Sequence, residues 1–336
     1  MIRIEIDEPT LARTRIAISP LAELVCGLYL LDRNPDRVPW PYEAWAAHAR
    51  KILATDPAVA PVHLYSRLGA VFPDLFTPIP PGSLPTITDE LDVLRATSAE
   101  LVEEQFAKHY PDGEPDFLRP FRQDRVAAFA TLADGLAAYW DAAIAPYWPA
   151  MRAALDEEVL LRARALAADG PDALLSKLHE RVRWERPVLT LIKPLEQSFE
   201  SVDQRLLLVP LIFSRGALMC SGDHPDVLMV TYQSRGAAVL AESQAVSTVN
   251  DQDRLAILLG RGRASVLRAL TTPATTTGLA TTLGLAASTV SEHLSGLQAA
   301  GVVHRRRAGR RVLYGLEPAG VALVGLLDSG AAEFVS

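Results

Sequence analysis

The chain has 336 residues, of which 49% are hydrophobic and 22% charged, and its formal net charge is −7 at pH 7. This composition excludes a disordered chain, and the length suffices for one large and one small domain. Two cysteines are too few for a disulfide framework. The most apolar runs, at 21–31 and 206–213, are too short to cross a bilayer, and the first residues do not form a basic and then apolar leader. We therefore expect a cytoplasmic protein without membrane contacts.

The first 245 residues mix helices with a few strands. Alternating apolar residues predict a strand at Met1–Ile6 and another at 15–19, and Pro20 then begins an apolar helix that ends at Leu31. Helical spacing continues through most of the following 150 residues, with Pro-rich breaks between segments. The predicted helices are 42–54, 88–110, 117–141, 146–168 and 171–184, and the predicted strands that follow are 187–192, 205–213 and 227–232.

A stretch poor in large side chains, residues 238–252, marks the predicted domain boundary. The sequence thus predicts an N-terminal sensing and dimerising domain at 1–245 and a C-terminal domain at 250–336. The fold class is α+β and mostly α. All five tryptophans lie in the N-terminal part, where they form either an aromatic pocket for a ligand or plain core: Trp40, Trp45, Trp140, Trp148 and Trp184.

Residues 275–316 predict a helix, a tight turn, a second helix and a hairpin, which together make a winged helix-turn-helix. Thr275 is the expected N-cap of the first helix, and Gly284 permits the turn. In the second helix Val290, Leu294 and Leu297 recur on one face, so they should face the core. The opposite, small and polar face suits a major groove about 12 Å wide, where a glutamate can accept a hydrogen bond from cytosine.

The ends of the second helix carry two further signals. Gly301 supplies the left-handed residue that ends a helix, and Val302 can contact Leu297 across that ending. Its start is less clear. Either it begins at Ser288, or it begins at Ala286 and lacks a side-chain cap, an omission that costs about 1 kcal/mol.

Two β-prone runs, 302–307 and 311–316, are joined through Ala308-Gly309 and predict the wing. Five arginines lie within seven residues of this hairpin, and no acidic residue lies among them. Phosphate is their natural counter-charge. Residues 250–336 carry nine arginines against six acidic residues, a net charge of +3, whereas residues 1–249 carry −10. DNA should therefore meet only the C-terminal end of the chain.

These residues resemble the ArsR-type family of bacterial repressors, over roughly Asp253 to Leu316. The run STVSEHLSGLQAAGVV has the look of that family's recognition helix, and the wing follows at once. Residues 205–237 resemble, less specifically, a region of unknown function that precedes ArsR-type winged helices in high-GC bacteria. The sequence departs from the family pattern at two positions. Family members carry a serine or a similar cap where this chain has Ala286, and a capping box has Glu where this chain has Gly278.

The resemblance implies a homodimeric transcriptional regulator, more often a repressor, that binds a palindromic operator in double-stranded DNA under the control of a small-molecule effector. No cofactor is expected. The tail residues Val321, Val324 and Leu327 form one candidate dimer stripe, with more of the interface expected within 1–245. The residues expected to contact DNA are Thr275, Thr276, Ser288, Thr289, Ser291, Glu292, His293, Ser295, Arg305, Arg306, Arg307, Arg310 and Arg311.

Three alternatives remain beside this hypothesis. The winged helix could serve protein contacts only. A metal-responsive repressor would need about four convergent thiolate, imidazole or carboxylate ligands, but residues 276–283 contain no Cys or His and the tail contains no His. An enzyme fused to a DNA-binding domain would be expected to show a phosphate-binding loop, a nucleophile elbow or an HExxH motif, and the sequence contains none of these. We therefore expect no enzymatic activity.

Overall fold

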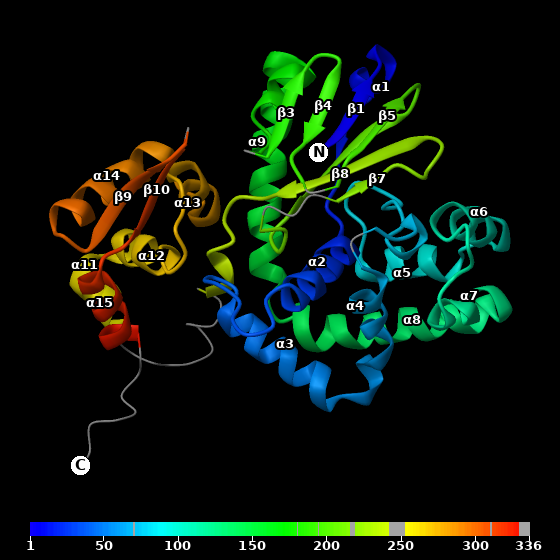
Figure 1. The fold of residues 1–336 in the computed structure, drawn as a ribbon, viewed down its shortest axis with the longest axis horizontal. Coiled ribbons are helices and arrows are strands. Elements are labelled where there is room, and N and C mark those ends of the chain that lie inside the picture. The colour runs from blue at the N-terminus through cyan, green and yellow to red at the C-terminus, as the bar shows by residue number, and fades with distance from the viewer. Residues whose placement is uncertain are drawn as a thin grey trace. The chain divides into compact units, whose positions relative to one another are not determined.

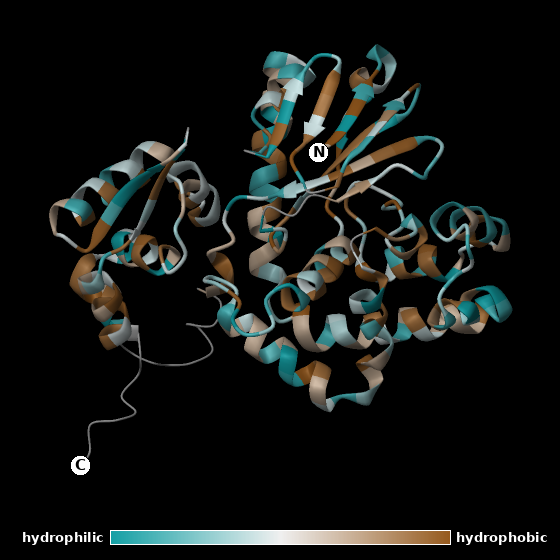
Figure 2. Cartoon of the chain, viewed as in Figure 1, coloured by the Kyte–Doolittle hydropathy of each residue, from teal (hydrophilic) through white to brown (hydrophobic). Residues whose placement is uncertain are grey.

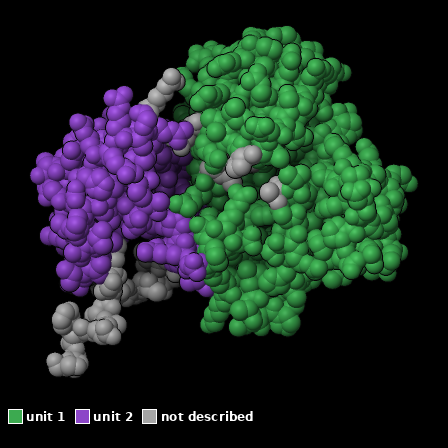
Figure 3. Space-filling model, viewed as in Figure 1, with its two compact units in different colours: residues 1–35, 48–234 green, residues 36–47, 235–336 purple. Residues whose placement is uncertain are grey.

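The computed structural model describes residues 1–69, 71–179, 181–193, 195–215, 219–241, 253–309 and 311–328. The fold is α+β and mostly α, as predicted (Figure 1). Contacts divide the chain into two compact units, 1–35 with 48–234 and 36–47 with 235–336 (Figure 3). Residues 36–47 and 235–241, which the sequence analysis assigned to the N-terminal domain, thus group with the C-terminal unit. Of the composition break at 238–252, residues 242–252 lie outside the described residues.

The first unit contains two four-stranded sheets. One has the order β3-β4-β1-β5, from strands Val182–Glu185, Val188–Leu191, Ile2–Ile6 and Gln197–Ser201. The other has the order β2-β6-β8-β7, from strands Arg15–Ile16, Arg205–Leu211, Val227–Gln233 and Cys220–Ser221. In this second sheet β6 runs parallel to both β2 and β8. Every residue of β8 is buried, as expected for a parallel strand covered on both faces.

Nine α-helices precede β3 in the described part of the chain, and α3 has residues in both units. They are α1 (Glu8–Ala12), α2 (Pro20–Asp32), α3 (Glu43–Thr55), α4 (Leu64–Leu68), α5 (Ile87–Arg95), α6 (Ala99–His109), α7 (Arg119–Gln123), α8 (Arg125–Tyr139) and α9 (Trp148–Ser176). Short 3-10 segments lie at Pro57–His63, Asp74–Phe76 and Asp116–Leu118, and a π-helical turn extends α8 at Trp140–Ile144. None of the helices in the described ranges combines the length and apolarity that a bilayer-spanning helix needs.

Three predicted helices were wrong in extent. The helix expected at 117–141 is a 3-10 segment followed by α7 and α8, with the non-helical Asp124 between the two helices. The helix expected at 88–110 is two helices, because Ser98 caps α6 by accepting a hydrogen bond from the backbone N–H of Leu101 at 3.2 Å. The helix expected at 171–184 instead continues α9 past a kink at Gly170, where φ is 78°, and ends at Ser176. Trp184 lies in strand β3, where its indole N–H donates to Asp172 at 2.7 Å.

Hydrophobic residues of both sheets, among them Ile4, Leu206 and Leu228, share one core of the first unit with residues of α1 and α9. Figure 2 shows hydrophobic residues along β4 and β8. The rings of Trp140 and Trp148 meet edge to face, with their centroids 4.9 Å apart. Trp140 is buried, as is the neighbouring Tyr139. These rings pack as core residues.

Two glutamates are fully buried near the start of α2. Glu23 accepts hydrogen bonds from the backbone N–H groups of Ile212 and Phe213, at 2.5 and 3.1 Å. Glu90 accepts from the Ser19 hydroxyl and from a backbone N–H in the first turn of α2. Burial disfavours the charged form and raises the pKa of each carboxyl to about 8, although these hydrogen bonds oppose the shift. Their carboxyl groups therefore join α2 to the end of β6 and to α5.

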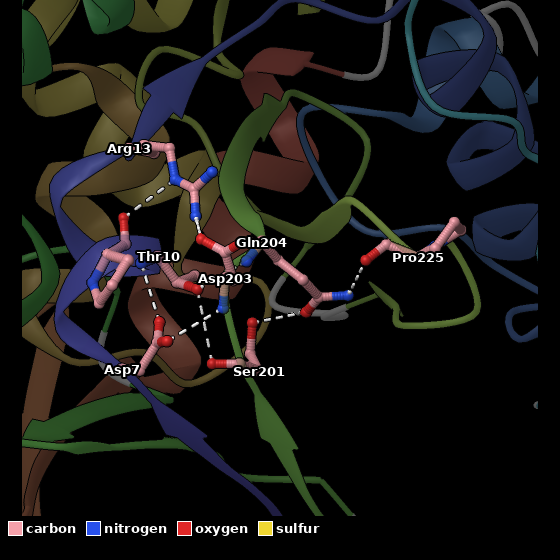
Figure 4. A network of polar contacts seen from close by, with 8 residues as sticks. Asp7, Thr10, Arg13, Ser201, Asp203, Gln204 and Pro225 are labelled. Atoms are coloured by element: carbon pink, nitrogen blue, oxygen red, sulfur yellow. Dashed lines mark hydrogen bonds and ion pairs between the residues drawn. The ribbon is translucent and has the colours of Figure 1, made fainter.

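A polar network holds the turn between β5 and β6 (Figure 4). Asp7 caps α1 and also accepts a hydrogen bond from the backbone N–H of Asp203 at 3.0 Å. The Asp203 carboxylate forms an ion pair with Arg13. The backbone of Asp203 has a φ of 54°, in the left-handed region. Gln204 donates from its amide to the carbonyl oxygen of Pro225 at 3.1 Å. These contacts fasten α1 to the ends of both sheets.

Candidate nucleic-acid interface

The second unit is a winged helix-turn-helix, as predicted. Its elements are α11 (Arg254–Leu259), α12 (Arg261–Ala269), α13 (Thr276–Leu283), α14 (Ala287–Ala299), β9 (Val303–Ala308), β10 (Arg311–Leu316) and α15 (Pro318–Asp328). Leu267 of α12, Leu279 of α13 and Val303 of β9 share one core with Leu294 and Leu297 of α14. The core thereby fixes the position of α14 against the two preceding helices and the hairpin.

The helix-turn-helix turn has the geometry that the sequence predicted. The Thr275 hydroxyl caps α13 by accepting a hydrogen bond from the backbone N–H of Gly278 at 3.0 Å. Gly284 has a φ of 68° in the left-handed region, and the N–H of Leu285 reaches back to the carbonyl of Ala280 at 3.1 Å. This hydrogen bond closes the helix as a Schellman ending, so α14 leaves the turn in a fixed direction.

The start of α14 decides whether the recognition helix begins at Ser288 or begins earlier without a side-chain cap. The helix begins at Ala287, and Ala286 occupies the N-cap position without a side-chain hydrogen bond. The recognition helix therefore lacks a cap. Its other end is as predicted: Gly301 has a φ of 72°, and the N–H of Val302 donates to the carbonyl of Leu297 at 3.2 Å.

One face of α14 is polar and open to solvent. Ser288, Glu292 and Ser295 are exposed on the side opposite the buried core residues, while Thr289 is half-buried at the edge. The Ser295 hydroxyl donates to the carbonyl of Ser291 at 2.8 Å, so its oxygen remains available as an acceptor. Glu292 forms no ion pair with any residue in the described ranges. This face can therefore offer hydroxyl groups and one unpaired carboxylate to base edges.

His293 lies on the flank of α14 and faces α12. A Cβ atom built on Gly262 of α12 would lie 2.5 Å from Nε2 of His293, so the missing side chain of Gly262 makes room for the ring. The ring thus packs against a helix of its own unit.

The wing is an antiparallel hairpin in which Arg305 pairs with Tyr314 and Arg307 with Val312. Gly309 has a φ of 62° at its tip, and the predicted contact residue Arg310 lies outside the described residues. Because side chains alternate along a strand, Arg305 and Arg307 share the face of the buried Val303. By the same alternation and pairing, Arg306 and Arg311 lie on the other face.

An open groove of about 460 Å³ lies between the end of α14, the start of β9 and the start of α15. Its lining includes Gln298, Arg305 and Glu317, together with His304, whose Nδ1 lies 3.5 Å from Oε1 of Glu317. Arg305 shares its face of the hairpin with Val303, which packs in one core with Leu294 and Leu297 of α14. This is the side on which the recognition helix and the wing can act together.

The segment directly after β8 belongs to the scaffold of this unit. The backbone N–H of Gly236 donates to the carbonyl of Thr281 at 2.9 Å, and that of Ala238 donates to the carbonyl of Thr282 at 3.0 Å. A Cβ on Gly284 would lie 3.3 Å from the Cα of Gly236, so segment and turn are in close contact. Residues 235–241 thus hold the end of α13, and the sequence pattern did not predict this.

The predicted DNA-contacting residues come from three places. Thr275 and Thr276 stand half-buried at the start of α13, the serines, threonine and glutamate lie along α14, and the described arginines project from the wing. Within the described ranges no three or more His, Cys, Asp or Glu residues gather as metal ligands would.

Comparison with known proteins supports this interface. A family model described as a helix-turn-helix domain matches residues 262–306, which cover α12 to the middle of β9. No curated protein matches the chain, and no solved structure matches it. Together with the geometry, the match identifies the C-terminal unit as the DNA-binding domain of a transcriptional regulator.

Proposed function

We propose that this DNA-binding regulator is a repressor of ArsR type that binds a palindromic operator as a homodimer and is released by a small-molecule effector. The observation that carries the proposal is the exposed face of α14, with Ser288, Glu292 and Ser295 opposite the buried core residues. An α-helix is about 10–12 Å wide and a major groove about 12 Å, so only small side chains leave the helix room to enter deeply. The resemblance to ArsR-type proteins supports the finer assignment.

Base contacts should come from Thr289 and Glu292. Replacing each by alanine should weaken binding to the cognate operator by roughly 1–3 kcal/mol per good contact and leave binding to random DNA almost unchanged. The measurement is a titration of full-length protein against an operator selected from a random library and against a scrambled duplex. Thr277→Ala, on the exposed side of α13, is the control. Equal losses on both DNAs would show that these side chains only position the helix.

The proposed dimer has a candidate surface on α11 and α15. Ile257 and Leu258 of α11 are 71% and 60% exposed, and Val321 and Leu326 of α15 are 58% and 63% exposed. Monomers rarely expose such large side chains together without a partner, and both helices contribute to one core. Of the stripe proposed from the sequence, Val321 is exposed, whereas Val324 and Leu327 are half-buried against that core.

Introducing charge on this surface should separate the subunits. The double change Ile257→Asp and Leu326→Asp should convert a sedimenting dimer to a monomer at micromolar concentration, because four unpaired carboxylates would enter the apolar contact. The same substitution at Leu160 of α9, which is 52% exposed, is the control. A dimer that survives the double change would place the interface elsewhere, as the sequence analysis expected for residues 1–245.

An effector would act through the first unit. If it binds more tightly to a conformation in which the two recognition helices are badly spaced for successive major grooves, it must weaken DNA binding by the same factor. We propose that the first unit senses this molecule and has no enzymatic activity of its own.

A further inference from the structure

The two flanks of the recognition helix have different neighbours. Gln298 and Gly296 are two residues apart and so point about 200° apart around the axis of α14. Gln298 lines the groove that Arg305 of the wing also lines. On the other flank the nearest side chain to Gly296 is that of Arg263, whose Nε lies 3.8 Å from where a Cβ of Gly296 would stand. Guanidinium groups therefore accompany α14 on both sides.

Arg263 is not used to hold the domain together. Its side chain is exposed, and it makes neither a hydrogen bond nor an ion pair with any residue that the structure describes. Arg268, on the same helix, is by contrast bound to Asp253 at 2.8 Å. An unpaired guanidinium beside the recognition helix is suited to a ligand that brings its own negative charge.

The position of Arg263 is fixed by the packing of α12 on α14. His293 sits against Gly262, the neighbouring residue, and this contact sets the register between the two helices. The absence of a side chain at Gly296 leaves the surface beside Arg263 open. The arginine can therefore extend along the flank of α14 without an obstacle from that helix.

We propose that Arg263 contacts a backbone phosphate on the side of the major groove opposite the wing. A helix about 10–12 Å wide fills a groove about 12 Å wide, so each flank of the helix meets one phosphate backbone. The wing supplies the contact on one flank and Arg263 supplies it on the other. The inference rests on the proposed insertion of α14 into the groove, and it adds a residue that positions the helix between two backbones.

The experiment measures the salt dependence of binding for full-length Arg263→Ala on a mixed-sequence duplex of about 30 base pairs. Each lost phosphate contact should flatten the slope of log K against log salt by about 0.9 per bound chain. Arg263→Lys should restore most of the slope, since an ammonium group also neutralises a phosphate. Arg254→Ala is the charge-matched control, because Arg254 is an exposed arginine on α11 of the same unit.

The outcomes separate this inference from the proposed function. An Arg263→Ala slope equal to that of the wild type, or a change equal to that of Arg254→Ala, would overturn the phosphate contact while DNA binding itself stands. A wild-type protein that binds no duplex would overturn the proposed function, and the inference with it. Circular dichroism of the variant gives a second readout, because a folded Arg263→Ala protein with a flattened slope is the result expected.

Discussion

Removing Arg305 and Arg307 together should make DNA binding much less sensitive to salt. Each arginine is expected to neutralise one phosphate, so a dimer loses four contacts and its slope of log K against log salt flattens by about 3.6. The loss of binding affinity should be the same on operator and on random DNA, because phosphate contacts carry no sequence information. The slopes come from titrations of full-length Arg305→Ala/Arg307→Ala between about 50 and 200 mM salt.

The wing contains its own control for this experiment. Arg306 and Arg311 lie on the opposite face of the hairpin, so Arg306→Ala/Arg311→Ala removes the same charge from the face opposite Val303. The two double variants would behave alike if the wing acted only through its total charge. A larger effect of the Arg306 and Arg311 pair would show that the other face meets the DNA.

The stability of the first unit should fall as the pH rises, and Glu23 should account for much of the fall. Its pKa is raised from 4.5 to about 8 in the folded state, so between these values the folded chain holds a proton that the unfolded chain releases. The stabilisation is therefore present below about pH 4.5 and is lost as the pH rises through about 8. Each unit of pKa corresponds to about 1.4 kcal/mol, so the change amounts to a few kcal/mol.

Urea unfolding of full-length protein at pH 5, 7 and 9, followed by tryptophan fluorescence, measures this dependence. Trp140, Trp148 and Trp184 lie in the first unit, whereas Trp40 and Trp45 lie in the segment 36–47 of the second unit, so the first unit contributes most of the signal. Glu23→Gln should reduce the pH dependence without abolishing it, because the amide does not titrate while Glu90, whose pKa is also raised to about 8, still does. The exposed Glu157→Gln should leave the profile unchanged. A wild-type profile that is flat across this range would mean that Glu23 is ionised and held by its two backbone donors.

The winged helix could be predicted from the sequence because its signals are local. Thr275, Gly284 and Gly301 each fix a helix end through hydrogen bonds to residues at most five positions away, and the structure shows those bonds. The apolar spacing at Val290 and Leu294 assigned the buried face of α14 for the same reason. The sequence was therefore sufficient to predict the structure wherever residues close in sequence determine the backbone conformation.

The first unit depends on contacts that no local pattern shows. Strand β1 pairs with β4 and β5, between 183 and 195 residues further along the chain. Strand β5 has the polar sequence QSFES, which is not typical of a strand. Glu23 stands in an apolar helix, and only the end of β6 provides it with donors. Such pairings become visible only once the chain is folded.

The candidate interface likewise has features that the local sequence predicts and features that depend on contacts between elements. The run of arginines predicted a phosphate-binding wing, but the strand pairing was needed to separate Arg305 from Arg306 by face. Arg263 was missed because its importance comes from Gly296, a residue of another helix. No spacing within either helix indicates that these two residues are neighbours.

The hydrogen bonds from Gly236 and Ala238 to the end of α13 bear on how this domain can be transplanted. A chimaera cut at the composition break would leave these two residues behind and expose the carbonyl oxygens of Thr281 and Thr282 beside the turn. The unit comprises residues 36–47 together with the stretch from Arg235 onward, so a foreign sensor has to be joined no later than Arg235. Gly236 and Ala238, which adjoin the stretch that looks like a linker, are therefore part of the DNA-binding module.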